Sequence, residues 1–138
     1  MAALIVVVDS GPLYAAADLD DADHDASLAA LSNPGLHLVI PAMVVAEVTY
    51  FIGTRLGPLA EARFLLGLAQ LEVEAPLSGD WERIAELVTQ YHDFPLGGTD
   101  ASVVALAERL ETETVATLDR RHFSAVRPRH CQALHLIP

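Results

Sequence analysis

Four acidic residues lie where the chain is expected to pass from one structural element to the next: Asp9, Glu47, Asp100 and Asp119. Carboxylates are the ligands that hard cations such as Mg²⁺ and Mn²⁺ prefer, and these ions usually keep several waters. A cation held in this way lowers the pKa of a bound water and neutralises charge on a phosphodiester. The chain has one cysteine, and its six histidines show no HExxH-like spacing, so a zinc ligand set is not indicated. The residue types therefore predict metal-assisted phosphoryl chemistry.

Asp9 and Glu47 each have a functional and a structural interpretation. Asp9 follows Leu4–Val8, a run expected to form a buried strand, and ligands bind beyond the carboxyl ends of such strands. A turn or capping aspartate explains Asp9 equally well. On a helix, the neighbours of Glu47 three and four residues away are all apolar or aromatic: Met43, Val44, Tyr50 and Phe51. A carboxylate on such a core-facing stripe needs a cation, hydrogen bonds or a buried salt bridge to an arginine.

Asp100 and Asp119 are ambiguous when each is considered alone. Asp100 opens an expected helix, Thr99–Leu110, where capping and the helix dipole favour aspartate without any function. Asp119 ends an expected strand, Thr114–Leu118, and repeats the geometry of Asp9. Three or four carboxylates from distant segments are more informative together than singly, and together they predict one metal cage.

The elements that must position these acids alternate between strands and helices. A helix begins at Ser10, which can cap it, with Pro12 in its first turn. The remaining helices are expected at His24–Ser32, Ala42–Arg55, Leu59–Ala69, Ser78–His92 and Thr99–Leu110, and the remaining strands at Leu38–Ile40, Glu72–Glu74, Thr114–Leu118 and Ala133–Leu136. This alternation predicts an α/β three-layer sandwich, a central mostly parallel sheet flanked by helices. No linker or repeat divides residues 1–138, so a single domain is expected.

Composition limits the classes of protein. The chain is 52% hydrophobic, and its mean hydropathy of +0.35 suggests apolar surface covered by a partner, most simply in a homodimer. The longest apolar stretch, residues 36–53, is interrupted by His37, Pro41 and Glu47, so no membrane segment is expected. The start has no basic region or cleavage site of a signal peptide. With a single cysteine, Cys131, the reducing cytoplasm is the expected location.

Charge is distributed unevenly along the chain. The net charge is −11, with eight arginines and no lysine, which by itself disfavours a nucleic-acid partner. Half of the basic residues nevertheless fall within ten positions near the end: Arg120, Arg121, Arg127 and Arg129. These arginines could hold RNA phosphates, and a solvated arginine-rich turn is the alternative interpretation.

The chain resembles the PIN-domain ribonucleases, and among them the VapC toxins of bacterial VapBC toxin–antitoxin pairs. The resemblance spans nearly the full length through VVVDSGPLYA, PAMVVAEVTYFIG, DFPLGGTDASVVALAERL and VATLDRRHF. It implies a PIN-like fold and a metal-dependent endoribonuclease that uses Mg²⁺, with Mn²⁺ able to substitute. Asp9, Glu47, Asp100 and Asp119 match the four acidic positions of the family, and Ser10 and Thr117 match the hydroxyl residues that often flank them.

The same resemblance implies partners and a substrate class. The expected function is that of a type II toxin that cleaves structured RNA, tRNA or rRNA, and is inhibited by a VapB-like antitoxin. A homodimer is expected, and the apolar helices over residues 42–55 and 59–69 are candidates for the dimer and antitoxin surfaces. A housekeeping PIN nuclease of RNA processing is one alternative. A non-catalytic module, whose acids bind a basic peptide, is another.

Overall fold

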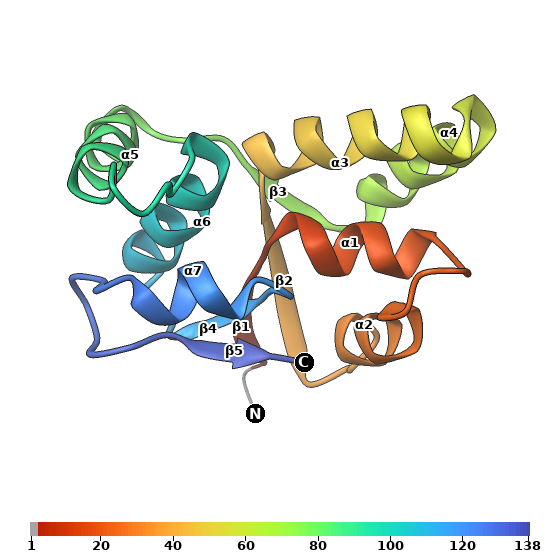
Figure 1. Cartoon of the computed structure of the whole chain (residues 1–138). Coiled ribbons are helices and arrows are strands. Elements are labelled where there is room, and N and C mark those ends of the chain that lie inside the picture. Colours follow the sequence, from red (N-terminus) through yellow and green to blue (C-terminus); the bar gives the residue numbers. More distant parts are fainter. Residues whose placement is uncertain (1–2) are drawn as a thin grey trace.

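In the computed structural model, which describes residues 3–138, five strands form one sheet in the order β3-β2-β1-β4-β5 (Figure 1). The strands are β1 Leu4–Val8, β2 Leu36–Pro41, β3 Glu72–Glu74, β4 Thr114–Ala116 and β5 His135–Ile137. Every neighbouring pair is parallel. The expected mostly parallel sheet is therefore confirmed, and within the described residues it is wholly parallel.

Helices cover both faces of this sheet. They are α1 Ser10–Ala17, α2 His24–Leu31, α3 Ala42–Leu56, α4 Pro58–Gly67, the 3₁₀ helix η1 Leu68–Gln70, α5 Ser78–Gln90, α6 Gly98–Arg109 and α7 Arg120–Ala125. Figure 1 shows α1 and α2 on one side of the sheet and α5 and α6 on the other, which confirms the three-layer arrangement. In the part of the chain that the structure describes, no helix is long and apolar enough to span a bilayer.

Burial explains why the first strand and one helix are so apolar. β1 is the central strand, paired with β2 and β4, and Val6, Val7 and Val8 expose no surface. The α6 residues 101–107 are all buried, because this helix lies between the sheet and α5. A strand and a helix that are covered all round have no solvent face, so neither shows a polar stripe in the sequence.

Backbone contacts draw the ends of β1 and β4 together. The Asp9 N–H donates to the Ala116 carbonyl at 2.9 Å, so the pairing of the two strands continues into the residue that follows β1. Gly11, in the first turn of α1, lies so close to the chain after β4 that a Cβ placed there would be 3.2 Å from the Leu118 Cβ. A residue without a side chain is therefore favoured at position 11. Asp9 and Asp119 consequently lie at the same edge of the sheet.

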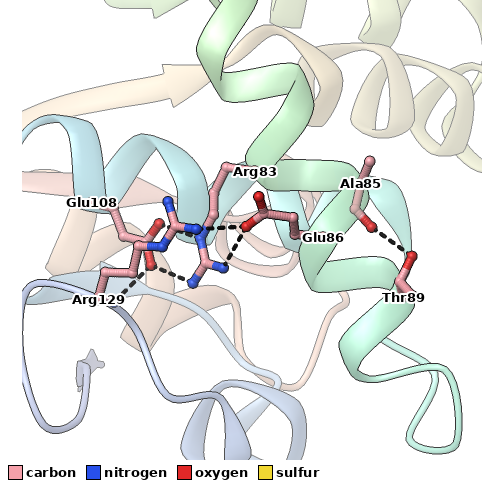
Figure 2. A network of polar contacts seen from close by, with 6 residues as sticks. All are labelled: Arg83, Ala85, Glu86, Thr89, Glu108 and Arg129. Carbon is pink, nitrogen blue, oxygen red and sulfur yellow. Dashed lines mark hydrogen bonds and ion pairs between the residues drawn. The ribbon is translucent and has the colours of Figure 1, made fainter.

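An ion-pair network fastens α5 to α6 (Figure 2). Arg83 donates from Nε and Nη2 to the two carboxylate oxygens of Glu108 at 2.8 and 2.9 Å, and Arg129 donates to Glu86 at 2.6 Å. Burial tends to raise the pKa of Glu108, but the hydrogen bonds from Arg83 and from the Arg129 N–H outweigh it and hold the pKa below its usual 4.5. Bidentate pairing of this kind fixes the two helices relative to each other.

One local expectation is wrong, and one helix was not expected. Ser10 does not cap α1: Asp9 occupies the N-cap position, and Ser10 is the first residue of the helix. The segment after β4, for which an arginine-rich turn was the alternative interpretation, contains the helix α7, whose N-cap Asp119 accepts a hydrogen bond from the His122 N–H. A six-residue helix rich in arginine has too short an apolar pattern to be recognised in a sequence.

Candidate metal site

The four acids predicted from the sequence line one open pocket at the carboxyl ends of β1 and β4. This pocket has a volume of about 560 Å³, and its lining residues are Asp9, Ser10, Gly11, Glu47, Asp100, Leu118 and Asp119. Asp9 and Asp119 follow strands, Asp100 lies in the first turn of α6 and Glu47 lies on α3. The pocket thus combines side chains from four segments that are distant in sequence, as expected at the carboxyl edge of a parallel sheet.

Asp9 is the most enclosed of the four acids. Its side chain is buried, and its Oδ2 accepts a hydrogen bond from the Thr117 hydroxyl at 2.7 Å. The Thr117 oxygen in turn accepts from the Asp119 N–H at 3.0 Å. Burial raises the pKa of Asp9 above 3.8, and the nearby charges of Glu47 and Asp119 act in the same direction, against the hydrogen bond from Thr117. Thr117 therefore holds one acid directly and the backbone of a second.

Asp100 has the same electrostatic character. Burial, followed by the charges of Asp9, Asp119 and Glu47, raises the pKa of Asp100 from 3.8 to about 6. Repulsion among carboxylates acts in this way when a cation does not neutralise them. At neutral pH the ionised Asp100 carboxylate therefore lowers the free energy of unfolding, and a bound cation would remove this cost.

Glu47 lies at the edge of its helix's buried stripe. The buried residues of α3 are Val44, Val48 and Ile52, while Glu47 is half-buried and Tyr50 is 65% exposed. The expectation that Glu47 faces the core is therefore only partly right. Its half-buried position leaves the carboxylate accessible from the pocket.

Comparison with known proteins identifies the fold and its relatives. A family model described as "PIN domain" matches residues 6–127. The chain belongs to the PIN-domain family. It is 40% identical over 125 residues to "Ribonuclease VapC26" of Mycobacterium tuberculosis, a match that covers 89% of this chain and 93% of the relative.

Solved structures share the fold at low sequence identity. VapC20 of Mycobacterium tuberculosis, described as a sarcin-ricin loop cleaving toxin, matches with a TM-score of 0.72 and 16% identity over 80% of this chain and 86% of that one. VapBC2 from Rickettsia felis, bound to a DNA fragment from its promoter, matches with a TM-score of 0.71 and 17% identity over 98% and 100%. At these identities the likeness concerns the fold alone.

The pocket of this PIN domain fits a hard divalent cation by its donor chemistry. Its acids supply only oxygen ligands. The buried Ser10 hydroxyl also lines the pocket and has no hydrogen-bond partner in the described part of the chain. Within residues 3–138 no group of three or more acidic, histidine or cysteine side chains is already arranged to hold an ion directly. Carboxylates spaced around an open pocket suit an ion that keeps part of its water shell, as Mg²⁺ does.

The four C-terminal arginines are not gathered at this pocket, and none of them lines it. Arg129 is paired with Glu86, and Arg120 donates to the carbonyl oxygen of Pro138. The Arg121 guanidinium lies 5.2 Å from the centre of the Phe94 ring. Arg127 is exposed on the surface. Three of the arginines predicted to contact RNA thus have different partners within the protein, and the partner of Arg129 is acidic.

Two residues beside the pocket, His122 and Phe94, were not predicted from the sequence. His122 contacts Asp119 through both its backbone and its ring, and Phe94 packs against the His122 ring. His122 follows Asp119 by three residues, a spacing that one helical turn brings into contact, but α7 was not expected. No sequence pattern indicated Phe94, because its contact with His122 joins residues 28 positions apart in the chain.

Proposed function

We propose that this PIN domain is a Mg²⁺-dependent endoribonuclease and the toxin of a type II toxin–antitoxin pair. One observation carries the proposal: four carboxylates line a single pocket, and among the described residues no arginine forms an ion pair with any of them. The 40% identity to a protein named Ribonuclease VapC26 supports the choice of RNA as the substrate. Mn²⁺ would substitute for Mg²⁺ at an all-oxygen site.

A bound divalent ion supplies a water of lowered pKa and neutralises charge on the phosphodiester. Asp9, Glu47, Asp100 and Asp119 would hold that ion and its waters. Thr117 keeps the Asp9 carboxylate in one orientation through the 2.7 Å hydrogen bond. The Ser10 hydroxyl, which has no hydrogen-bond partner among the described residues, is free to hold a water or a phosphate oxygen in the pocket. The expected products carry a 5′-phosphate and a 3′-hydroxyl.

The substrate class we propose is structured RNA of the translation machinery, tRNA or rRNA. An acidic protein with a net charge of −11 repels RNA, so the local potential at the pocket must be inverted by the bound ions. Arg127, which is exposed, and Arg121, which lies over Phe94 near Asp119, are the C-terminal arginines best placed to add phosphate contacts.

We further propose a VapB-like antitoxin as inhibitor and a homodimer as the toxin's own assembly in the cytoplasm. A pocket of carboxylates that pair with no arginine in residues 3–138 is complementary to a basic side chain of an inhibitor. The helices α3 and α4 expose large apolar side chains, Tyr50 at 65%, Leu59 at 77% and Leu66 at 75%. Such a surface is typical of one covered by a partner protein.

The test is cleavage of total bacterial RNA by the purified protein with Mg²⁺, with Mn²⁺ and with EDTA. Discrete fragments that require metal and vanish in Asp9→Asn are expected, and end-mapping would then identify the RNA. Asparagine keeps an oxygen that can accept from the Thr117 hydroxyl, so the variant should remain folded. The matched control is Asp25→Asn, which alters an exposed aspartate on α2 that does not line the pocket.

Cleavage by Asp9→Asn at the wild-type rate would refute the proposed role of the pocket. An absence of cleavage by folded, inhibitor-free wild type under all metal conditions would favour the non-catalytic module. Cleavage restricted to precursor RNAs, without an effect on mature tRNA or rRNA, would favour a housekeeping nuclease.

A further inference from the structure

Asp119 is the one acid of the pocket whose two carboxylate oxygens are both held by the same residue. The His122 N–H donates to Oδ1 at 3.0 Å, and the His122 ring Nδ1 lies 2.8 Å from Oδ2. An ionised carboxylate can only accept hydrogen bonds, so Nδ1 carries the proton in this contact. Each oxygen accepts one hydrogen bond and keeps a further lone pair for another partner.

The His122 ring is itself held by an aromatic contact. The rings of Phe94 and His122 have centroids 4.7 Å apart and are tilted by 41°. Phe94 belongs to the segment between α5 and α6, four residues before α6 begins at Gly98. Asp100 lies in the first turn of that helix. The ring contact therefore joins the segment that leads to Asp100 to the helix that follows Asp119.

We propose that His122 is a positioning residue that fixes the orientation of the Asp119 carboxylate toward the pocket, and that Phe94 holds His122 in place to do so. The proposal rests on the function proposed above, because it assumes that Asp119 helps to hold the metal ion. Without the hydrogen bond from the His122 Nδ1 the Asp119 side chain could rotate, since within residues 3–138 its carboxylate then accepts only from the His122 N–H. A ligand that must be ordered before it binds loses affinity by that entropy.

Residues that orient metal ligands typically change metal affinity by about 10- to 100-fold when they are replaced. The loss should depend on whether a donor remains where Nδ1 lies. In His122→Asn the side-chain amide nitrogen occupies nearly the position of Nδ1 and can still donate to Asp119. In His122→Gln the amide nitrogen lies one bond further out, near the position of Nε2. These two variants have the same charge and polarity and differ in the reach of the donor.

A second pair of variants tests the aromatic support. Phe94→Tyr keeps the ring, whereas Phe94→Leu keeps apolar volume and removes the aromatic contact with His122. His92→Gln, an exposed change in the same segment, is the control for nonspecific effects on the loop. All variants should be compared at a temperature well below their melting points, with their secondary structure checked by circular dichroism.

The measurement is the dissociation constant for Mn²⁺, by isothermal titration calorimetry and by the electron paramagnetic resonance of free Mn²⁺, without RNA. His122→Asn, Phe94→Tyr and His92→Gln should lie within about threefold of wild type, and His122→Gln should bind about tenfold more weakly. Phe94→Leu should show a smaller loss in the same direction. Should His122→Gln fail to fold, Phe94→Leu against Phe94→Tyr makes the same comparison.

The outcomes separate this proposal from the one on which it depends. Equal Mn²⁺ affinity in wild type and in folded His122→Gln and Phe94→Leu would overturn the positioning role and leave the metal site intact. Equal losses in His122→Asn and His122→Gln would also overturn it, because the position of the donor would then not matter. A wild-type protein that binds no Mn²⁺ would overturn the metal site and the positioning role together.

Discussion

Replacement of Asp100 by asparagine should stabilise the metal-free protein at neutral pH, although it removes a proposed metal ligand. The pKa of Asp100 is raised from 3.8 to about 6 by burial and by three neighbouring carboxylates. The folded state therefore binds a proton more tightly than the unfolded state does. Stability is lost as the pH rises from 3.8 toward 6, and the full penalty is present above that range.

The size of the gain in stability follows from the same rise in the pKa of Asp100. A rise from 3.8 to about 6 corresponds to about 3 kcal/mol, which falls to about 1–2 kcal/mol because solvent screens a side chain that is only half-buried. Asparagine also loses the favourable interaction of a carboxylate with the first turn of α6, about 0.3–1 kcal/mol. The expected net gain is about 1 kcal/mol at pH 7.5, or about 3–5 °C in melting temperature. At pH 4 the gain should nearly vanish.

The assay is thermal unfolding of wild type and Asp100→Asn with EDTA, at pH 4, 5.5 and 7.5. Asp25→Asn is the matched control, because Asp25 also lies in the first turn of a helix but is exposed. That variant should lose stability slightly at pH 7.5, through the helix dipole alone. A gain in Asp100→Asn that is equal at pH 4 and pH 7.5, or a loss at pH 7.5, would refute the argument from repulsion.

Three further results are expected. A divalent ion at a concentration of about 100 times its dissociation constant should stabilise wild type by about 3 kcal/mol in thermal unfolding. This gain should be lost in Asp9→Asn. Equal gains in both proteins would mean that the ion binds elsewhere. Thr117→Val removes the hydroxyl that links Asp9 to the Asp119 backbone. It should lower the free energy of unfolding, measured in urea, by about 1–3 kcal/mol and should also lower the cleavage rate. Unchanged stability would contradict the role of this buried hydrogen-bonded link. Glu108→Gln breaks the bidentate pair with Arg83 and should lower the free energy of unfolding by about 2–3 kcal/mol. This loss should shrink as the pH falls through the lowered pKa of Glu108. RNA cleavage should be unchanged at temperatures where the variant is folded.

Much of the architecture could be predicted because the patterns are local. The run Leu4–Val8 is β1, and the helix expected over residues 42–55 is α3, Ala42–Leu56. The break between α3 and α4 occurs at Gly57, whose φ of +93° favours glycine. These features depend on residue preferences within a few positions, which a sequence displays directly.

The proximity of Asp9 and Asp119 could be predicted for a more general reason. Parallel strands carry their carboxyl ends to the same edge, so an acid after β1 and an acid after β4 must lie near each other once the strands pair. The Val7–Val115 and Val8–Ala116 register places Asp9 and Thr117 side by side. The pairing of the strands, rather than any one residue, therefore makes this half of the acidic group predictable.

The contacts that hold the acids in place could not be predicted. His122 and Phe94 meet only because α7 forms and the segment before α6 lies against it. Likewise Arg129, the last of the four arginines predicted to contact RNA, is paired with Glu86 on α5. Such partners are separated by tens of residues, and no periodic pattern in a single sequence relates them.

The placement of the arginines is the strongest argument that the pocket is kept for an added cation. Ion pairs on the α5–α6 side of the molecule involve three of the eight arginines: Arg83, Arg109 and Arg129. A fourth, Arg55, lies over the rings of Tyr14 and Phe51. A purely structural role for the four acids would call for one of these arginines at the pocket, because neighbouring carboxylates without a cationic partner such as arginine destabilise the fold. The divalent ion proposed above would instead restore the stability lost at Asp9 and Asp100, and folding and metal affinity would then be linked through the same charges.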